Sequence, residues 1–142
     1  MDKLRPNDGA GANDRLLIVD DDLEFITILR HMLNEYSDQH FATSAIEGLR
    51  MARELLPDLI LVDYEMPDLS GADLCTVLKS DPVLRAVPVI FITGHHKTAV
   101  ITATFKAGGS DFITKPVSRA LLLRRVREQL QPSHERKSPA GA

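Results

Sequence analysis

The sequence predicts an α/β protein with a mainly parallel sheet and helices on both of its faces. Short continuous apolar runs, typical of strands that are buried on both sides, alternate with segments whose apolar residues recur every three or four positions. This alternation of strand and helix occurs five times along the chain. Parallel strands need crossover helices, and nearly all such crossovers are right-handed, so a doubly wound sheet is expected.

Length and composition indicate a single globular domain. The chain has 142 residues, of which 44% are hydrophobic and 26% charged. The single cysteine, Cys75, excludes an internal disulfide framework and a cysteine-rich metal site. No signal region and no apolar run of about 20 residues is present, so we expect a cytoplasmic protein without membrane contact. A net charge of −3 gives no general attraction to nucleic acid, and we expect no direct binding to it.

The first half of the chain contains three predicted strands. Residues 1–14 are rich in Gly, Pro, Asn and Asp and are expected to be a flexible leader. Leu16–Val19 is an apolar run, and Asp22 is placed to cap the helix that follows it. The apolar stripe of that helix comprises Phe25, Ile26, Leu29, Met32, Leu33 and Tyr36. His40–Thr43 is a short candidate edge strand, and a helix from Ala45 to Leu56 precedes the strand Leu59–Val62.

The second half repeats the pattern. The predicted elements are a helix over Ala72–Lys79, a strand over Val87–Ile92, a helix over Thr98–Lys106, a strand over Asp111–Thr114 and a helix capped by Ser118. Gly108 ends the second of these helices, and Pro132 is expected to stop the last one. The domain is therefore predicted to span residues 15–130, with a flexible tail over 131–142.

Polar residues follow four of the five predicted strands. They are Asp20, Asp21, Asp63, Thr93 and Lys115. Because the carboxyl ends of parallel strands share one edge of the sheet, these side chains are expected to converge there. Three neighbouring carboxylates repel one another, and Mg²⁺ relieves this repulsion because it prefers oxygen ligands, whereas zinc is disfavoured. With a hydroxyl and a lysine close by, the set indicates phosphoryl-transfer chemistry.

These motifs resemble those of a response-regulator receiver domain of bacterial two-component signalling. The motifs are Ile18–Asp22, Leu61–Pro67 with Gly71, Phe91–Gly94 and Lys115–Pro116, and the resemblance covers about Arg15 to Leu130. It implies a flavodoxin-like fold with strand order 2-1-3-4-5. It also implies that Asp63 accepts a phosphoryl group. The Mg²⁺ ligands would be Asp21, Asp63 and the main-chain carbonyl of Glu65, with Asp20 acting through water.

The resemblance assigns further roles by position. Lys115 would pair with Asp63 and then with the phosphoryl oxygens, and Thr93 would move to bond the phosphoryl group. Phe112 stands where the family places its switch aromatic, without the hydroxyl of the frequent tyrosine. The Lys115–Pro116 peptide would be cis. Glu65 and His95 occupy positions that tune the lifetime of the acyl phosphate.

The implied function is a phosphorylation-dependent signalling switch and not a conventional enzyme, apart from phosphotransfer to its own aspartate and slow self-dephosphorylation. The donor would be a sensor histidine kinase or a histidine phosphotransfer protein. The face formed by the fourth helix, fifth strand and fifth helix would contact a downstream protein or a second copy. The kinase, the stimulus, the output, the oligomeric state and the phosphoryl lifetime stay open, as does whether the chain is part of a longer regulator or hybrid kinase.

Two alternatives remain at this point. A haloacid-dehalogenase-type phosphatase uses an Asp-x-Asp motif similar to Asp20–Asp22, but Glu24 stands where Thr or Val is expected, and the chain is short for a cap. A degenerate receiver that only binds partners is the second alternative, although all five key residues are present. His95 and His96 are adjacent in a loop, which is poor geometry for chelating a metal.

Overall fold

A computed structural model describes residues 13–94 and 97–137 of the chain, the side chains of residues 132–137 excepted. Five parallel strands form one sheet in the order β2-β1-β3-β4-β5, which confirms the predicted topology. The strands are β1 (Arg15–Val19), β2 (Asp38–Ala42), β3 (Leu59–Asp63), β4 (Val89–Thr93) and β5 (Asp111–Thr114). The helices are α1 (Leu23–Met32), α2 (Ala45–Leu55), α3 (Gly71–Ser80), α4 (Thr98–Lys106) and α5 (Arg119–Lys137).

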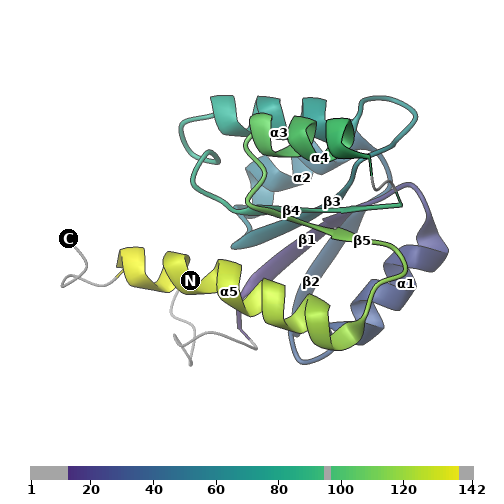
Figure 1. The fold of residues 1–142 in the computed structure, drawn as a ribbon. Coiled ribbons are helices and arrows are strands. Elements are labelled where there is room, and N and C mark those ends of the chain that lie inside the picture. The colour runs from purple at the N-terminus through teal and green to yellow at the C-terminus, as the bar shows by residue number, and fades with distance from the viewer. Residues whose placement is uncertain (1–12, 95–96, 138–142) are drawn as a thin grey trace.

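Helices cover both faces of the sheet, with α2, α3 and α4 on one face and α1 and α5 on the other (Figure 1). Successive strand residues point to opposite faces, so each strand contributes to two apolar cores. Leu16 and Ile18 belong to the core under α1 and α5, whereas Leu17 and Val19 belong to the core under α2 and α3. Burial on both faces explains why these strands are continuous apolar runs.

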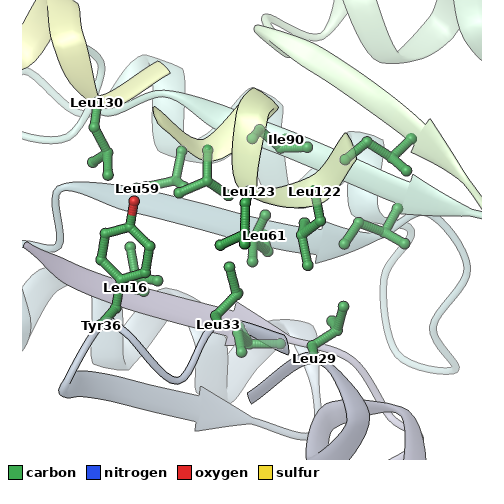
Figure 2. Packing of buried hydrophobic residues seen from close by; sticks show 14 of the residues in the cluster. Leu16, Leu29, Leu33, Tyr36, Leu59, Leu61, Ile90, Leu122, Leu123 and Leu130 are labelled. Atoms are coloured by element: carbon green, nitrogen blue, oxygen red, sulfur yellow. The ribbon is translucent and has the colours of Figure 1, made fainter. Parts of the chain in front are cut away.

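The core beneath α5 contains several leucines of the sheet and of the helix (Figure 2). Leu59 and Leu61 of β3 lie beneath Leu122 and Leu123 of α5, and all four are buried. Through these contacts α5 packs on β3, the strand that ends in Asp63. Among the described residues, no helix has the length and apolarity needed to cross a membrane.

Two predicted boundaries in the first half are wrong. α1 ends at Met32 and not near Tyr36, which lies in the following turn but is still buried. The side-chain amide of Gln39 donates to the carbonyls of Leu33 at 2.7 Å and Tyr36 at 2.8 Å, so these carbonyls find partners outside a helix. β2 covers Asp38–Ala42 and not His40–Thr43, because its pairing with β1 begins at Arg15 and Asp38.

Smaller shifts occur in the second half. β4 begins at Val89 and not at Val87, since Pro88 has no N–H for the ladder, although its carbonyl accepts the N–H of Ile60 at 3.1 Å. α3 is one residue longer at each end than predicted and is capped by Ser70. The Lys115–Pro116 peptide is cis, as the resemblance implied.

The predicted end of the last helix is also wrong. α5 continues through Pro132 to Lys137 and extends past the sheet in Figure 1. A proline removes one N–H donor from a helix and tends to kink it, but the residues beyond it are still able to take helical dihedral angles. The helix thus covers residues 131–137 of the expected tail, whose flexibility stays a prediction. Residues 138–142 lie outside the described part of the chain, as does most of the expected leader.

Gly71 allows α3 to begin directly against the end of β3. Its N–H donates to the carbonyl of Tyr64 at 2.7 Å. A Cβ atom at this position would overlap the carbonyl oxygen of Asp63 and lie 3.0 Å from the Cα of Tyr64. The loop after Asp63 therefore requires a residue without a side chain at this point.

We expect Gly71→Ala to lower the free energy of unfolding by about 1–3 kcal/mol, because backbone atoms must move to admit the methyl group. Urea denaturation measures this change. Gly94→Ala is the matched control, because a Cβ there meets no atom within 4 Å. Equal stability of the two variants would contradict the close packing at Gly71.

Candidate functional site

The structure brings the five predicted site residues to one edge of the sheet. Oxygen atoms of Asp20, Asp21 and Asp63 lie within 4.8 Å of one another. Lys115 follows β5, and its Nζ lies 3.9 Å from Oδ2 of Asp20. Thr93 ends β4, and its carbonyl accepts the N–H of Lys115 at 2.8 Å. Residues distant in the sequence therefore meet because parallel strands end on the same side.

A cavity of about 640 Å³ opens at this edge. Its lining residues are Asp21, Asp22, Asp63, Glu65, Met66, Pro67, Thr93, Gly94 and Lys115. Glu65, predicted from the family pattern, thus lies in the same cavity as Asp63. His95, the second predicted lifetime-tuning residue, lies outside the described residues.

Asp20 is the buried member of the acid group, with 2% of its surface exposed. Burial raises the pKa of its carboxyl group, since the charged form loses contact with water. The N–H of Asp22 partly offsets this by donating to Oδ1 of Asp20 at 2.8 Å. The N–H of Asp20 in turn donates to the carbonyl of Ala42 at 3.1 Å, which ties the group to the end of β2.

Asp63 is half-buried at the exit of β3. Burial first, and then the negative charge of Asp20, raise the pKa of Asp63 to about 6. The positive charge of Lys115 and a long hydrogen bond of 3.4 Å from the N–H of Glu65 lower the pKa but do not cancel this rise. The carboxylate therefore lies where a further negative charge is costly and a cation is stabilising.

Lys115 forms an ion pair with Asp20 at the end of β1. The pairing with Asp63 that the family pattern implied stays a prediction, although the positive charge of Lys115 already lowers the pKa of Asp63. The ring of Phe25 in α1 lies 4.2 Å from Nζ of Lys115, and this cation–π contact favours a position on the α1 side. Phe25 was predicted only as an apolar residue of the helix stripe, and its spacing alone could not show that it faces the lysine.

The acid group suits a hard divalent cation. Its donors are carboxylate oxygens, which Mg²⁺ prefers, and no nitrogen or sulfur ligand belongs to the group in the described residues. The raised pKa of Asp63 is the mark of crowded, partly desolvated negative charge. Asp21 is exposed and Asp63 half-buried, so both are accessible from the cavity, while Asp20 lies beneath them. The residues present therefore fit Mg²⁺.

An aromatic pair joins β5 to α4. Phe112 packs against the core under α2 and α3 and makes an edge-to-face contact with Phe105, with ring centroids 6.0 Å apart. Phe105 is 46% exposed. The helix containing Phe105 was predicted correctly, but its contact with Phe112 follows from tertiary packing and has no local sequence signal.

We expect Asp63→Asn to stabilise the metal-free protein above about pH 6. A pKa raised from 3.8 to about 6 means that the native state binds more protons than the unfolded state between these values, so stability falls as the pH rises through this range. Asn cannot ionise and avoids this loss. With solvent screening of a half-exposed group, the gain is about 1 kcal/mol.

Urea denaturation in EDTA, followed across this pH range, measures the difference in unfolding free energy. The difference should be small near pH 4, where the unfolded-state carboxyl is about half protonated. A variant less stable than the wild type above about pH 6, or a gain that does not depend on pH, would contradict the electrostatic account.

The family model for the response regulator receiver domain matches residues 16–127. Response regulator PleD of Caulobacter vibrioides is 38% identical over 114 residues, which cover 80% of this chain and 25% of PleD. DNA-binding response regulator MtrA of Mycobacterium tuberculosis is 34% identical over 118 residues, which cover 82% of this chain and 50% of MtrA. The matched segment thus spans about a quarter to a half of the length of these curated relatives.

Solved structures show the same fold. The signal receiver domain of a signal transduction histidine kinase from Syntrophus aciditrophicus superposes with a TM-score of 0.77 at 33% identity, covering 84% of this chain and 91% of that one. A CheY-like response regulator receiver domain protein from Methanospirillum hungatei gives a TM-score of 0.79 at 27% identity, covering 89% and 99%.

Proposed function

The chain belongs to the response-regulator receiver domain family of two-component signalling, and from this membership we propose that it is a switch controlled by phosphorylation of Asp63. Receiver domains are regulatory phosphoacceptor domains that work with sensor histidine kinases. The observation that carries the proposal is the placement of Asp63 in one cavity with Thr93 and Lys115, beside two further aspartates. The phosphatase alternative is not retained, because its nucleophile would be Asp20, which is buried.

The donor in this proposal is a phosphohistidine of a sensor kinase or of a histidine phosphotransfer protein. One carboxylate oxygen of Asp63 attacks the phosphorus, a P–O bond forms, and the N–P bond breaks with its electron pair left on the donor imidazole. Asp21, Asp63 and the main-chain carbonyl of Glu65 are the proposed Mg²⁺ ligands, and Asp20 acts through water. When bound, Mg²⁺ would neutralise negative charge at the phosphoryl oxygens.

Lys115 and Thr93 would recognise the phosphoryl group. Lys115 offers a compact positive charge whose ion pair with Asp20, at 3.9 Å, is long and easily exchanged for a phosphoryl contact. Thr93 is 1% exposed at the end of β4 and would supply a hydroxyl donor after a small movement. Glu65 and His95 are proposed to set how long the acyl phosphate lasts before slow self-dephosphorylation.

Phosphorylation would change the conformation of the face formed by α4, β5 and α5. Thr93 ends the strand beside β5, and Phe112 of β5 contacts Phe105 of α4, so a movement of Thr93 has a packed route to this face. Phosphorylation would shift the population between two arrangements of these residues. A downstream protein or a second copy of the chain is the proposed partner.

Three arginines of α5 have partners within the chain. Arg125 pairs with Asp111 of β5 at 2.9 Å, and Arg127 lies 3.4 Å from Glu35. Arg119 donates to the main chain of α1. These contacts hold α5 in place, so the exposed Phe105 is the better candidate for partner binding. A cytoplasmic location without membrane or nucleic-acid contact stays a prediction for this chain, and MtrA is DNA-binding as a whole protein.

Acetyl phosphate with Mg²⁺ should add one phosphoryl group to the chain and release acetate. Intact mass measurement detects the adduct, and Asp63→Asn should remove it because the amide is not a nucleophile for this transfer. The degenerate-receiver alternative predicts no adduct. Absence of the adduct, with beryllofluoride also failing to change the amide NMR spectrum, would overturn the proposed function.

Mg²⁺ should stabilise the folded chain. At a concentration of 100 times its Kd the expected gain is about 2.7 kcal/mol, because the ion binds the native state and relieves repulsion there. Thermal unfolding with and without EDTA measures the gain. Asp21→Asn should reduce it strongly. Asp22→Asn is the control, since it removes the same charge from the adjacent residue, outside the acid group, and retains a side chain able to cap α1. Equal losses in both variants would contradict a localised site.

A further inference from the structure

The carboxylate of Asp68 joins the loop after the proposed acceptor to the beginning of another helix. Asp68 lies in the loop between β3 and α3. Its Oδ1 accepts the N–H of Ala45 at 3.1 Å, and its Oδ2 accepts the N–H of Ile46 at 3.0 Å. Both donors belong to the first turn of α2, more than 20 residues earlier in the chain. One side chain therefore connects two segments that the sheet alone does not link.

Asp68 satisfies more of the α2 terminus than the cap residue of that helix does. A helix starts with four N–H groups that have no partner inside it. In α2, the hydroxyl of Ser44 accepts one of them, from Glu47 at 3.1 Å, while Asp68 accepts two. A negative charge at the positive end of a helix strengthens these contacts. The hydrogen bond from Ile46 is the main cause that holds the pKa of Asp68 below its usual value.

The loop held by Asp68 carries part of the proposed metal site. Glu65 lies in this loop, and its main-chain carbonyl is a proposed Mg²⁺ ligand. Met66 and Leu69, on either side of Asp68 in the sequence, pack against the core. The loop is thus attached by two apolar contacts and, between them, by the hydrogen bonds of the Asp68 carboxylate. Removing it would leave the loop tip attached by apolar packing but free to shift relative to α2.

The same tie reaches the other half of the acid group. α2 follows β2, and the carbonyl of Ala42 at the end of β2 accepts the N–H of Asp20 at 3.1 Å. Contacts therefore run from the loop through Asp68 to the start of α2, and from there to Asp20. This route connects the ends of β1 and β3 on the side of the sheet where the acids meet.

We propose that Asp68 is a positioning residue for the metal and phosphoryl site: it holds the loop containing Glu65 at a fixed place relative to Asp20. The inference rests on the proposed function, because it concerns the affinity of the same Mg²⁺ site. Side chains that orient metal ligands without touching the metal typically change its affinity by about 10- to 100-fold when removed. Because Asp68 acts through a main-chain loop, we expect its removal to weaken the affinity for Mg²⁺ by about tenfold.

Amide hydrogen exchange in the metal-free protein tests the tie itself. Asp68→Ala should speed exchange both in Ala45 and Ile46 and in residues 64–66, because the contact between the two segments is lost. Ser44→Ala is the matched control, since it removes an acceptor from the same helix end without touching the loop. It should speed exchange in α2 only. Unchanged loop exchange in Asp68→Ala would overturn the proposal.

Calorimetric titration with Mg²⁺ tests the consequence. Asp68→Ala should raise the Kd about tenfold, whereas Ser44→Ala should leave it unchanged even though both variants lose stability. Asp68→Asn keeps one oxygen acceptor, but its NH₂ group replaces the other oxygen and cannot accept the second N–H. It should therefore also bind Mg²⁺ more weakly than the wild type.

The remaining outcomes are decisive. An equal Kd for Asp68→Ala and the wild type, or an equal weakening in Ser44→Ala and Asp68→Ala, would overturn the positioning role. A wild-type chain that binds no Mg²⁺ would overturn the proposed function instead, and the exchange measurement would still decide whether Asp68 holds the loop.

Discussion

The crowding of three carboxylates at one edge of a parallel sheet is the constraint on which the rest of the site depends. The sheet fixes where β1 and β3 end, so Asp20, Asp21 and Asp63 cannot separate without loss of strand pairing. Burial of Asp20 and partial burial of Asp63 strengthen their repulsion, and the pKa of Asp63 rises to about 6. An edge built in this way favours cations and groups that bring cations with them, which is the condition for placing a phosphoryl group beside a carboxylate.

The sequence predicted the strands at the centre of the sheet well because burial on both faces leaves a continuous apolar run. β1 and β3 were identified in this way, and their acids were placed correctly at the shared edge. β2 was shifted because an edge strand is partly polar and its limits are set by pairing with β1. Tyr36 was predicted correctly as buried but wrongly as helical, since a residue in a turn reaches the same core as one in a helix.

The parts of the site that the sequence did not reveal all depend on contacts between distant segments. Lys115 pairs with Asp20, and Phe25 of α1 lies against its ammonium group. In the sequence, Asp68 looks like an ordinary polar residue of a loop. Only the fold brings its carboxylate to the first turn of α2. Motif spacing identifies which residues meet at a strand end, because strand order determines that. It carries no information on side chains whose partners come from another helix.

The face formed by α4, β5 and α5 differs from a simple basic surface. Three of its arginines, Arg119, Arg125 and Arg127, have partners within the chain, whereas Phe105 presents an aromatic ring to solvent and touches Phe112 at its edge. Phe112 has no hydroxyl, so the position of its ring is decided by packing and not by a hydrogen bond. A partner that covers Phe105 would therefore favour one arrangement of Phe112. By linkage, the same free energy would act on the affinity of the acid cavity for a phosphoryl group or its analogue. Under the proposed function, partner binding and phosphorylation are therefore thermodynamically coupled, and this aromatic pair carries the coupling.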